Sequence, residues 1–236
     1  MKKKSIGILG GMGPLATADL YRKIIESTKA DDDNGHIRVY IDGNSAIPDR
    51  TRAILHGGPD PVPEMLSALR NLEACGADCI VMPCNTAHYF LPRLQEQTAI
   101  PILDMTEISA RHCAECFPGQ RICLLATKGT ILSHIYEPAL ERAGVDYLLP
   151  DETAQDELMR LIYDVVKASK PIRPEEEAWR RLLDSLRGKG ADCFLLACTE
   201  LPILSGILAV PGPFIDPTME LAREAIRFCG YPLKNE

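Results

Sequence analysis

Short apolar runs alternate with amphipathic stretches along most of this 236-residue chain. Apolar runs without polar alternation are typical of strands that are buried on both faces of a parallel sheet. Stretches with an apolar residue every three or four positions indicate helices that cover such a sheet. The pattern therefore predicts an α/β fold assembled from strand–helix–strand units.

The expected strands share a continuous apolar centre bounded by turn-forming residues. They lie at Ser5–Leu9, Arg38–Asp42, Cys79–Met82, Ile102–Leu103, Arg121–Ala126, Asp146–Leu149, Cys193–Ala197 and Phe214–Ile215. Helical periodicity fills the intervals between them. It is clearest at Leu15–Lys29, Pro63–Ala74, Asp156–Ala168 and Glu175–Lys189.

One segment of the chain occurs twice. Residues 76–86, GADCIVMPCNT, align without gaps with residues 190–200, GADCFLLACTE. In both copies a helix ends at a glycine, a buried strand follows, and a cysteine comes just past the carboxyl end of the strand. A second pair of similar strands, residues 6–10 and 122–126, recurs at nearly the same separation. The repeat predicts two similar parallel-sheet α/β half-domains related by pseudo-symmetry.

We expect the first α/β domain to comprise residues 1–107 plus 211–236, and the second to comprise residues 108–210. Open parallel sheets bind ligands beyond the carboxyl ends of their strands. The two repeated cysteines, Cys84 and Cys198, should therefore lie on opposite sides of an active-site cleft between the domains. Cysteines often only fill a core. These two, however, are followed by polar pairs, Asn85-Thr86 and Thr199-Glu200.

The charge and the cysteine count narrow the class of protein. The formal net charge of −7 argues against a surface that binds nucleic acid. No apolar stretch approaches the ~20 residues that a membrane helix needs. Nine cysteines, an odd number, without a secretory signal favour reduced thiols over a disulfide framework. We expect a cytoplasmic protein.

Two thiols on opposite sides of one carbon can remove a proton from one face and return a proton to the other. Such a pair works when one sulfur is a thiolate and the other a thiol, so the two sulfurs should titrate as a coupled unit. Hydrogen-bond donors must also stabilise the charge that develops on a neighbouring carboxylate. Asn85, Thr86 and Thr199 stand beside the cysteines and can supply such donors.

Six short segments, in this order along the chain, carry a resemblance to a known family. They are Gly10-Gly11-Met12-Gly13-Pro14, Ile47-Pro48-Asp49-Arg50-Thr51, Pro83-Cys84-Asn85-Thr86-Ala87-His88, Leu125-Ala126-Thr127, Ala197-Cys198-Thr199-Glu200-Leu201 and Ile215-Asp216-Pro217-Thr218. With these segments the chain resembles the aspartate/glutamate racemases. The resemblance implies two-cysteine racemisation of an amino acid without pyridoxal phosphate or another cofactor, a site between two α/β domains, and a homodimer.

The resemblance also implies roles for further residues. The Ile-Pro-Asp-Arg-Thr segment looks like the aspartate-racemase branch, in which its arginine, here Arg50, holds a substrate carboxylate. Lys167 matches the family's substrate-binding lysine. The remaining substrate-binding residues that we expect are Met12, Asn85, Thr86, Thr127, Thr199 and Glu200. Because a guanidinium binds a carboxylate with two hydrogen bonds, Arg50 favours an acidic amino acid as the substrate.

Other interpretations remain open at this point. Glutamate, a broader range of amino acids, or a hydantoin could be the substrate, and a non-catalytic amino-acid-binding protein could keep the same cleft. The stretch 11–16 loosely fits a dinucleotide-binding turn. His112 with Cys113-x-x-Cys116 could suggest zinc, but no second ligand pair stands at a normal spacing, and no metal is expected. His88 could orient Cys84 or serve only as a core or capping residue.

Overall fold

A computed structural model describes residues 3–234 of the chain. Within these residues seven strands form two parallel sheets, one in the order β2-β1-β3 and the other in the order β5-β4-β6-β7. The strands are β1 (Ile6–Leu9), β2 (Val39–Asp42), β3 (Cys79–Val81), β4 (Ile122–Ala126), β5 (Tyr147–Leu148), β6 (Cys193–Ala197) and β7 (Phe214–Ile215). The expected fold class, two parallel-sheet α/β regions, is confirmed.

Helices connect the strands and cover both sheets. The α-helices are α1 (Pro14–Ser27), α2 (Arg50–His56), α3 (Val62–Cys75), α4 (Leu91–Gln95), α5 (Met105–Cys116), α6 (Lys128–Leu132), α7 (Glu137–Arg142), α8 (Glu152–Arg160), α9 (Glu176–Gly188), α10 (Glu200–Leu208) and α11 (Pro217–Phe228). Short 3₁₀ turns lie at η1 (Asp33–Gly35), η2 (Thr86–Phe90) and η4 (Arg173–Glu175), and a π-helix lies at η3 (Leu161–Val166).

The two sheets are built in the same way. Ile6 of β1 is paired with Cys79 of β3, and Ile122 of β4 is paired with Cys193 of β6. On the outer side of β3 an isolated parallel bridge joins Ile80 to Ile102, where β7 pairs with β6 in the second sheet. The segment expected as a strand at 102–103 is thus only a bridge. The equivalent strand orders agree with the sequence repeat.

In each repeated strand, alternate residues share an apolar cluster with the cysteine that follows the strand. Ile80 and Met82 belong to one apolar cluster with Cys84, and Phe194 and Leu196 belong to another with Cys198. Both cysteines therefore lie on the same side of their own sheet as the alternate strand residues before them. The two cysteines thus have equivalent positions relative to their sheets.

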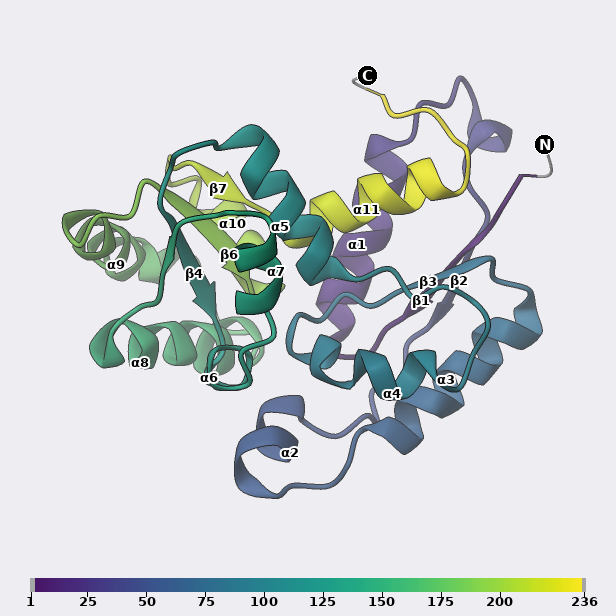
Figure 1. The fold of residues 1–236 in the computed structure, drawn as a ribbon, viewed down its shortest axis with the longest axis horizontal. Helices are drawn as coiled ribbons and strands as arrows, with labels where there is room; N and C mark the ends of the chain where they lie inside the picture. Colours follow the sequence, from purple (N-terminus) through teal and green to yellow (C-terminus); the bar gives the residue numbers. More distant parts are fainter. Residues whose placement is uncertain (1–2, 235–236) are drawn as a thin grey trace.

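Helices α5 and α11 lie between the two sheets (Figure 1). α11 packs against both α1 and α5, and α5 also contacts α7. Residues of α5 contribute to an apolar cluster on each sheet, Met105 and Ile108 on the first and Ala110 and Cys113 on the second. The two regions thus share their central helices.

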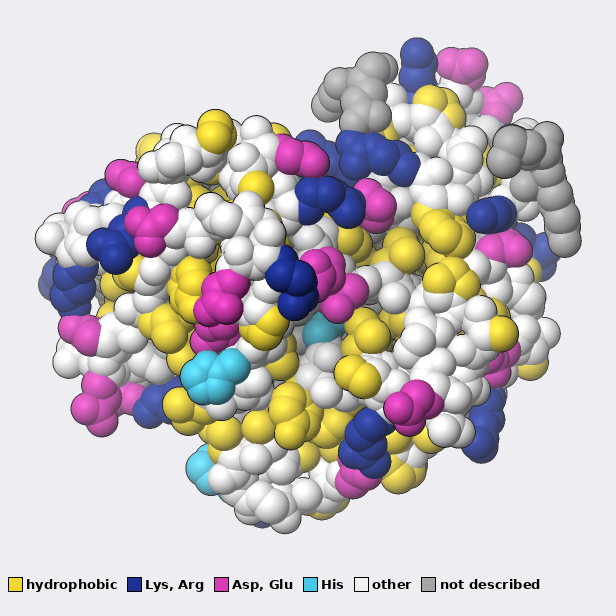
Figure 2. All heavy atoms as spheres, in the orientation of Figure 1, with side chains coloured by type: hydrophobic (Ala, Val, Ile, Leu, Met, Phe, Trp, Pro, Cys, Tyr) yellow, Lys and Arg dark blue, Asp and Glu magenta, His cyan; other side chains and the backbone are white. Residues whose placement is uncertain are grey.

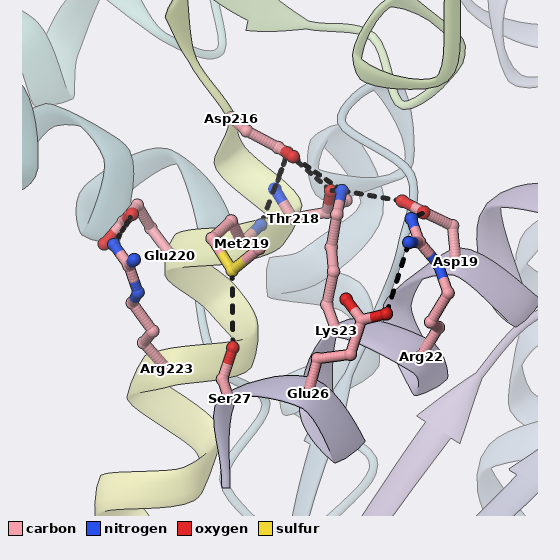
Figure 3. Close-up of polar contacts among 10 residues, drawn as sticks. All are labelled: Asp19, Arg22, Lys23, Glu26, Ser27, Asp216, Thr218, Met219, Glu220 and Arg223. Carbon is pink, nitrogen blue, oxygen red and sulfur yellow. Dashed lines mark hydrogen bonds and ion pairs between the residues drawn. The ribbon is translucent and has the colours of Figure 1, made fainter. Parts of the chain in front are cut away.

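A buried lysine fixes α11 to α1 (Figure 3). Lys23 of α1, only 4% exposed, lies 2.6 Å from Asp19 and 2.6 Å from Asp216, and donates to Thr218 Oγ1 at 2.5 Å. Asp216 is the N-cap of α11 and accepts from the backbone N–H groups of Thr218 and Met219. Because the lysine is paired on two sides, its burial is compensated.

The last strand and the last helix of the described chain pack on different regions. β7 pairs with β6 in the second sheet. α11 then packs on α1 and β3 of the first region. The return of the chain to the first region therefore falls between β7 and α11, because β7 completes the second sheet at the place that the bridge at Ile102 occupies in the first.

The surface and the helix lengths bear on possible partners. On the face shown in Figure 2, Lys and Arg side chains are interspersed with Asp and Glu rather than gathered in one basic area. From residue 3 to residue 234, no helix has the length and apolar character to cross a membrane.

Candidate active site

A small cavity lies where the two regions meet, beyond the carboxyl ends of β3 and β6. The first region contributes Asp49, Arg50, Thr51, Cys84, Asn85 and Thr86. The second contributes Thr127, Tyr163, Lys167, Cys198 and Thr199. The cavity has a volume of about 10 Å³, which is room for about one water molecule. Both repeated cysteines therefore line one small cavity.

Arg50 is buried on the Cys84 side of the cavity, at the start of α2. Its guanidinium donates to the backbone carbonyls of Met12 at 2.9 Å, Pro48 at 2.9 Å and Ile47 at 3.3 Å. Burial lowers the pKa of Arg50, but attraction to the Cys84 and Asp49 side chains outweighs this effect, and the net pKa is raised. A guanidinium held by neutral carbonyls keeps its full charge for the cavity.

Cys198 has the opposite surroundings. Its thiol donates to Glu200 Oε2 at 3.0 Å, and the Thr199 hydroxyl donates to the same oxygen at 3.2 Å. Burial raises the pKa of the Cys198 thiol well above its ordinary value, the Glu200 carboxylate raises it further, and Lys167 lowers it. The thiol is therefore the favoured form of Cys198 in this structure.

The π-helix η3 brings Tyr163 and Lys167 to the cavity. Lys167, its C-cap, bonds through its N–H to the carbonyl of Ile162, five residues earlier, at 2.9 Å. The Lys167 ammonium lies 4.5 Å from the centre of the Tyr163 ring and 3.9 Å from Glu200. Burial lowers the pKa of Lys167, but attraction to Glu200 and Cys198 raises it above its ordinary value. Single π-turns often occur at functional sites because they redirect side chains.

Hydroxyl groups from both regions meet at one side of the cavity. The Thr86 hydroxyl lies 3.0 Å from that of Thr127 and 2.9 Å from that of Thr130. Thr127 also caps α6 through the N–H of Thr130. Thr86 and Thr127 are both substrate-binding predictions, and the structure brings them into direct contact.

Asn85 is buried between the two regions. Its side-chain oxygen accepts a hydrogen bond from the hydroxyl of Tyr136, the N-cap of α7. Its amide nitrogen, Nδ2, has no hydrogen-bond partner within the described chain, and Nε of Arg50 is likewise unpaired. Two buried donors without partners among the residues that line one cavity are a feature expected of an anion-binding site.

A larger pocket of about 510 Å³ adjoins the cavity, and the two share Asp49, Arg50 and Lys167. Met12 and Glu200 line this pocket rather than the small cavity. The Met12 side chain is packed in a core cluster, and it is the Met12 carbonyl that holds Arg50.

Of the residues predicted from sequence, eight line the small cavity. They are Arg50, Cys84, Asn85, Thr86, Thr127, Lys167, Cys198 and Thr199. Sequence reasoning missed Asp49, Thr51 and Tyr163. Tyr163 lies four positions before Lys167, which on a helix places two residues on one face. Asp49 and Thr51 flank Arg50 in the sequence, and this position was the signal that could have identified them.

The remaining motifs have structural partners. His88 bonds through Nδ1 to the Cys84 carbonyl at 2.9 Å, and its Nε2 accepts from the N–H of Met105 at 3.1 Å. Both ring nitrogens are thus engaged by backbone. A Cβ at Gly11, whose φ is +90°, would lie 2.2 Å from the Asn44 carbonyl oxygen. The glycine therefore allows the Asn44 backbone to pass close to this turn.

The Cys113-x-x-Cys116 segment lies in α5, with Cys113 buried and Cys116 exposed. Between residues 3 and 234, no three or more His, Cys, Asp or Glu side chains are grouped to hold a metal ion.

The comparisons with known proteins match racemases. The family model described as Asp/Glu/hydantoin racemase matches residues 9–225. The broad-specificity amino-acid racemase RacX of Bacillus subtilis (strain 168) is 27% identical over 231 residues, which cover 94% of this chain and 96% of RacX. The structure of Picrophilus torridus aspartate racemase matches with a TM-score of 0.85 at 31% identity, over 98% of this chain and 96% of that one.

A more distant structure shares the fold. Glutamate racemase from Francisella tularensis subsp. tularensis SCHU S4, in complex with D-glutamate, matches with a TM-score of 0.66 at 18% identity, over 97% of this chain and 81% of that one.

Proposed function

The chain belongs to the Asp/Glu/hydantoin racemase family, and we propose that it interconverts L- and D-aspartate without a cofactor, using Cys84 and Cys198 as opposed proton-transfer groups. One observation carries the proposal. The two cysteines, which follow equivalent strands of equivalent sheets, line one small cavity together with Arg50 and Lys167. Racemases are isomerases, so membership of this family supports an isomerase activity.

The proposed reaction needs no oxidant or leaving group. The thiolate of one cysteine takes the α-proton and becomes a thiol, and the electron pair of the broken C–H bond spreads into the α-carboxylate. The thiol of the other cysteine then donates its proton to the opposite face of the carbon and becomes a thiolate. Because the reverse reaction exchanges the two roles, either sulfur must serve as acid and as base.

Unpaired donors support the binding of carboxylates. Arg50 Nε and Asn85 Nδ2 are buried and have no protein partner within residues 3–234. A substrate oxygen would satisfy them, and a donor aimed at the α-carboxylate is worth most when charge develops there. Arg50 and Lys167 together provide two positive charges, which suit a substrate with two carboxylates. Their arrangement is the reason for placing aspartate first.

The small cavity must widen to admit a substrate. Its volume of about 10 Å³ is far smaller than an amino acid, whereas the adjoining pocket of about 510 Å³ opens beside Asp49, Arg50 and Lys167. We therefore place the access route through that pocket. The widened site would close again around the bound amino acid and exclude water, which strengthens its electrostatic interactions.

A second candidate function is racemisation of glutamate or of a broader range of amino acids. The adjoining pocket favours it, because apolar residues such as Leu15, Ile47 and Ile203 line its walls and could accept a longer side chain. The similarity to RacX points the same way.

One experiment separates these candidates. The purified protein would be incubated separately with L-aspartate, L-glutamate and a panel of neutral amino acids. The circular-dichroism signal of each amino acid would then be followed with time. We expect the fastest loss of signal with L-aspartate, in buffer without pyridoxal phosphate, metal or nucleotide. Faster loss with L-glutamate or a neutral amino acid would favour the second candidate.

A protein that only binds amino acids would give no signal loss with any substrate. It would also fail to exchange the α-proton of aspartate with deuterated water. Absence of both rotation loss and deuterium uptake would refute racemisation.

The homodimer, the cytoplasmic location and the division into two domains remain proposals that rest on the sequence. Sedimentation of the purified protein tests the dimer directly.

A further inference from the structure

Asn85 is the part of the site whose orientation matters most for its chemistry. The two ends of its amide are opposite in character, since the oxygen accepts hydrogen bonds and the nitrogen donates two. Only a nitrogen that faces the cavity can bind a carboxylate. The amide is nearly symmetric in shape, so packing alone does not select one orientation. A specific hydrogen bond has to do so.

Tyr136 supplies that bond from the second region. It is the N-cap residue of α7, and its side chain is fully buried in the apolar cluster on the second sheet. Its hydroxyl donates to Oδ1 of Asn85, which follows β3 of the first region. The nitrogen at the other end of the amide is left without a partner in the part of the chain that the structure describes.

The surroundings of Tyr136 keep its hydroxyl a donor. Burial raises the pKa of Tyr136 above its ordinary value, although a contact with Ser109 of α5 lowers it in part. Burial therefore favours the protonated phenol, the form that can donate to Asn85. Ser109 is itself fixed, because its hydroxyl donates to the carbonyl of Met105 at 2.7 Å. The ring is enclosed by apolar neighbours and does not reach the cavity, whose lining excludes it.

We propose that Tyr136 is a positioning residue, whose hydroxyl holds the Asn85 amide with its nitrogen toward the substrate carboxylate. This inference rests on the proposed racemisation and adds a residue that does not touch the substrate. Tyr136 acts when charge builds on the carboxylate, because a donor already oriented costs no reorganisation at that moment. Loss of the hydroxyl lets the amide turn, so that its oxygen faces the anion for part of the time.

A double-mutant cycle tests the proposal. Tyr136→Phe removes only the hydroxyl and should lower kcat/KM for aspartate on the order of tenfold or more, with a fall in kcat. Asn85→Ala removes the amide altogether. If Tyr136 acts through Asn85, adding Tyr136→Phe to Asn85→Ala should change kcat/KM by less than about twofold.

Tyr147→Phe is the matched control. Tyr147 lies on β5 of the same region, and its hydroxyl donates to the exposed Glu141 at 3.5 Å. Its removal should leave kcat and KM unchanged. A purely structural role for Tyr136 predicts equal losses in the presence and absence of the Asn85 amide, and that result would overturn the proposal. Wild-type kinetics for Tyr136→Phe would overturn it as well.

A second variant covers the case in which Tyr136→Phe fails to fold. Asn85→Asp keeps an oxygen that accepts from Tyr136 but offers no N–H group to the substrate. Circular dichroism should show an intact fold, and racemisation should be lost. Retained activity would show that the amide nitrogen is not used. The failure of the proposed function is a separate outcome, because wild-type protein would then fail to racemise any amino acid.

Discussion

Cys84 and Cys198 have equivalent positions in the fold and unequal electrostatic neighbours. Arg50 lies beside Cys84, and Glu200 accepts a hydrogen bond from Cys198. A negative neighbour favours a thiol over a thiolate. Glu200 and burial therefore favour the thiol form of Cys198 in the free protein, which suits the acid of the proposed pair.

Replacing one cysteine at a time tests the assignment of the two faces. Cys84→Ala or Cys198→Ala should lower racemisation by roughly three orders of magnitude or more. The remaining sulfur should still exchange the α-proton of one enantiomer with solvent. Proton NMR in deuterated water, applied to L- and D-aspartate separately, should find opposite preferences in the two variants.

The control for this test is Cys116→Ala, which removes an exposed thiol from α5. It should racemise like the unmodified protein. The same preferred enantiomer in both cysteine variants would contradict opposed faces.

Glu200 should set the pH at which Cys198 acts as a base. Burial and the Glu200 carboxylate both raise the pKa of Cys198. Glu200→Gln removes the negative charge, so the pKa of Cys198 should fall and its thiolate should form at lower pH. In the Cys84→Ala background, where only Cys198 remains, the rise of deuterium exchange with pH should therefore move toward acid. A shift toward alkaline pH, or none, would show that Glu200 does not control Cys198.

At the scale of elements, short helices bring side chains from the two regions into contact. α2 carries Arg50 and Thr51, and it packs against α6, whose first turn is capped by Thr127. The close approach depends on Gly129 of α6. A Cβ there would lie 2.6 Å from Thr51 Oγ1 and 3.0 Å from Thr51 Cα.

Gly129→Ala should therefore separate α2 from α6. Overpacking of this kind costs about 1–3 kcal/mol in the free energy of unfolding. It should also lower kcat/KM, since Thr51 and Thr127 both line the cavity. Urea unfolding and initial rates measure the two effects.

Gly206→Ala is the matched control, because Gly206 lies within α10 and a Cβ there meets nothing within 4 Å. This change should be neutral or stabilising by up to about 1 kcal/mol. If Gly129→Ala behaves like Gly206→Ala, the α2–α6 approach is not tight.

Sequence predicted best where the chain repeats itself. The repeat identifies β3 and β6 and places a cysteine at the end of each, because buried parallel strands leave a continuous apolar run. The π-helix was not predictable, since the stretch 156–168 has ordinary helical periodicity and only the hydrogen bonding reveals the wider turn. Tyr136 was missed because its partner is 51 residues away, and no local pattern encodes such a contact. The spacing of Tyr163 from Lys167 was a local signal for Tyr163, but its bond to Asp49, 114 residues away, had none.

At the scale of the whole molecule, hydrogen bonds across the cavity hold the two regions together. Tyr163 of the second region donates to Asp49 Oδ2 of the first at 3.1 Å. Asp49 is also the N-cap of α2, so the bond connects η3 to the helix that begins with Arg50. The ion pairs of Lys23 with Asp19 and Asp216 join α11 to α1, away from this cavity. The Tyr163–Asp49 bond is therefore a contact that must adjust when the cavity widens.

Tyr163→Phe should weaken closure of the site while it keeps the ring beneath Lys167. The lost hydrogen bond is worth about 1 kcal/mol, so KM for aspartate should rise up to about fivefold. Initial rates over a range of aspartate concentrations measure this change. Tyr40→Phe is a suitable control, because Tyr40 lies on β2 with its ring beside Arg38. An unchanged KM in Tyr163→Phe would show that the bond does not contribute to closure.

The near absence of free volume in the cavity has a further consequence for the proposed reaction. When the site is closed around a substrate, bulk water cannot reach either sulfur, so the protons that move are those already present. Each turnover then leaves the pair reversed, with a thiol where the thiolate had been. Because burial and Glu200 favour the thiol form of Cys198, the reversed pair returns to its first arrangement through an open state in which water exchanges the protons. Until that exchange, the protonation of the two sulfurs depends on which enantiomer the protein last released.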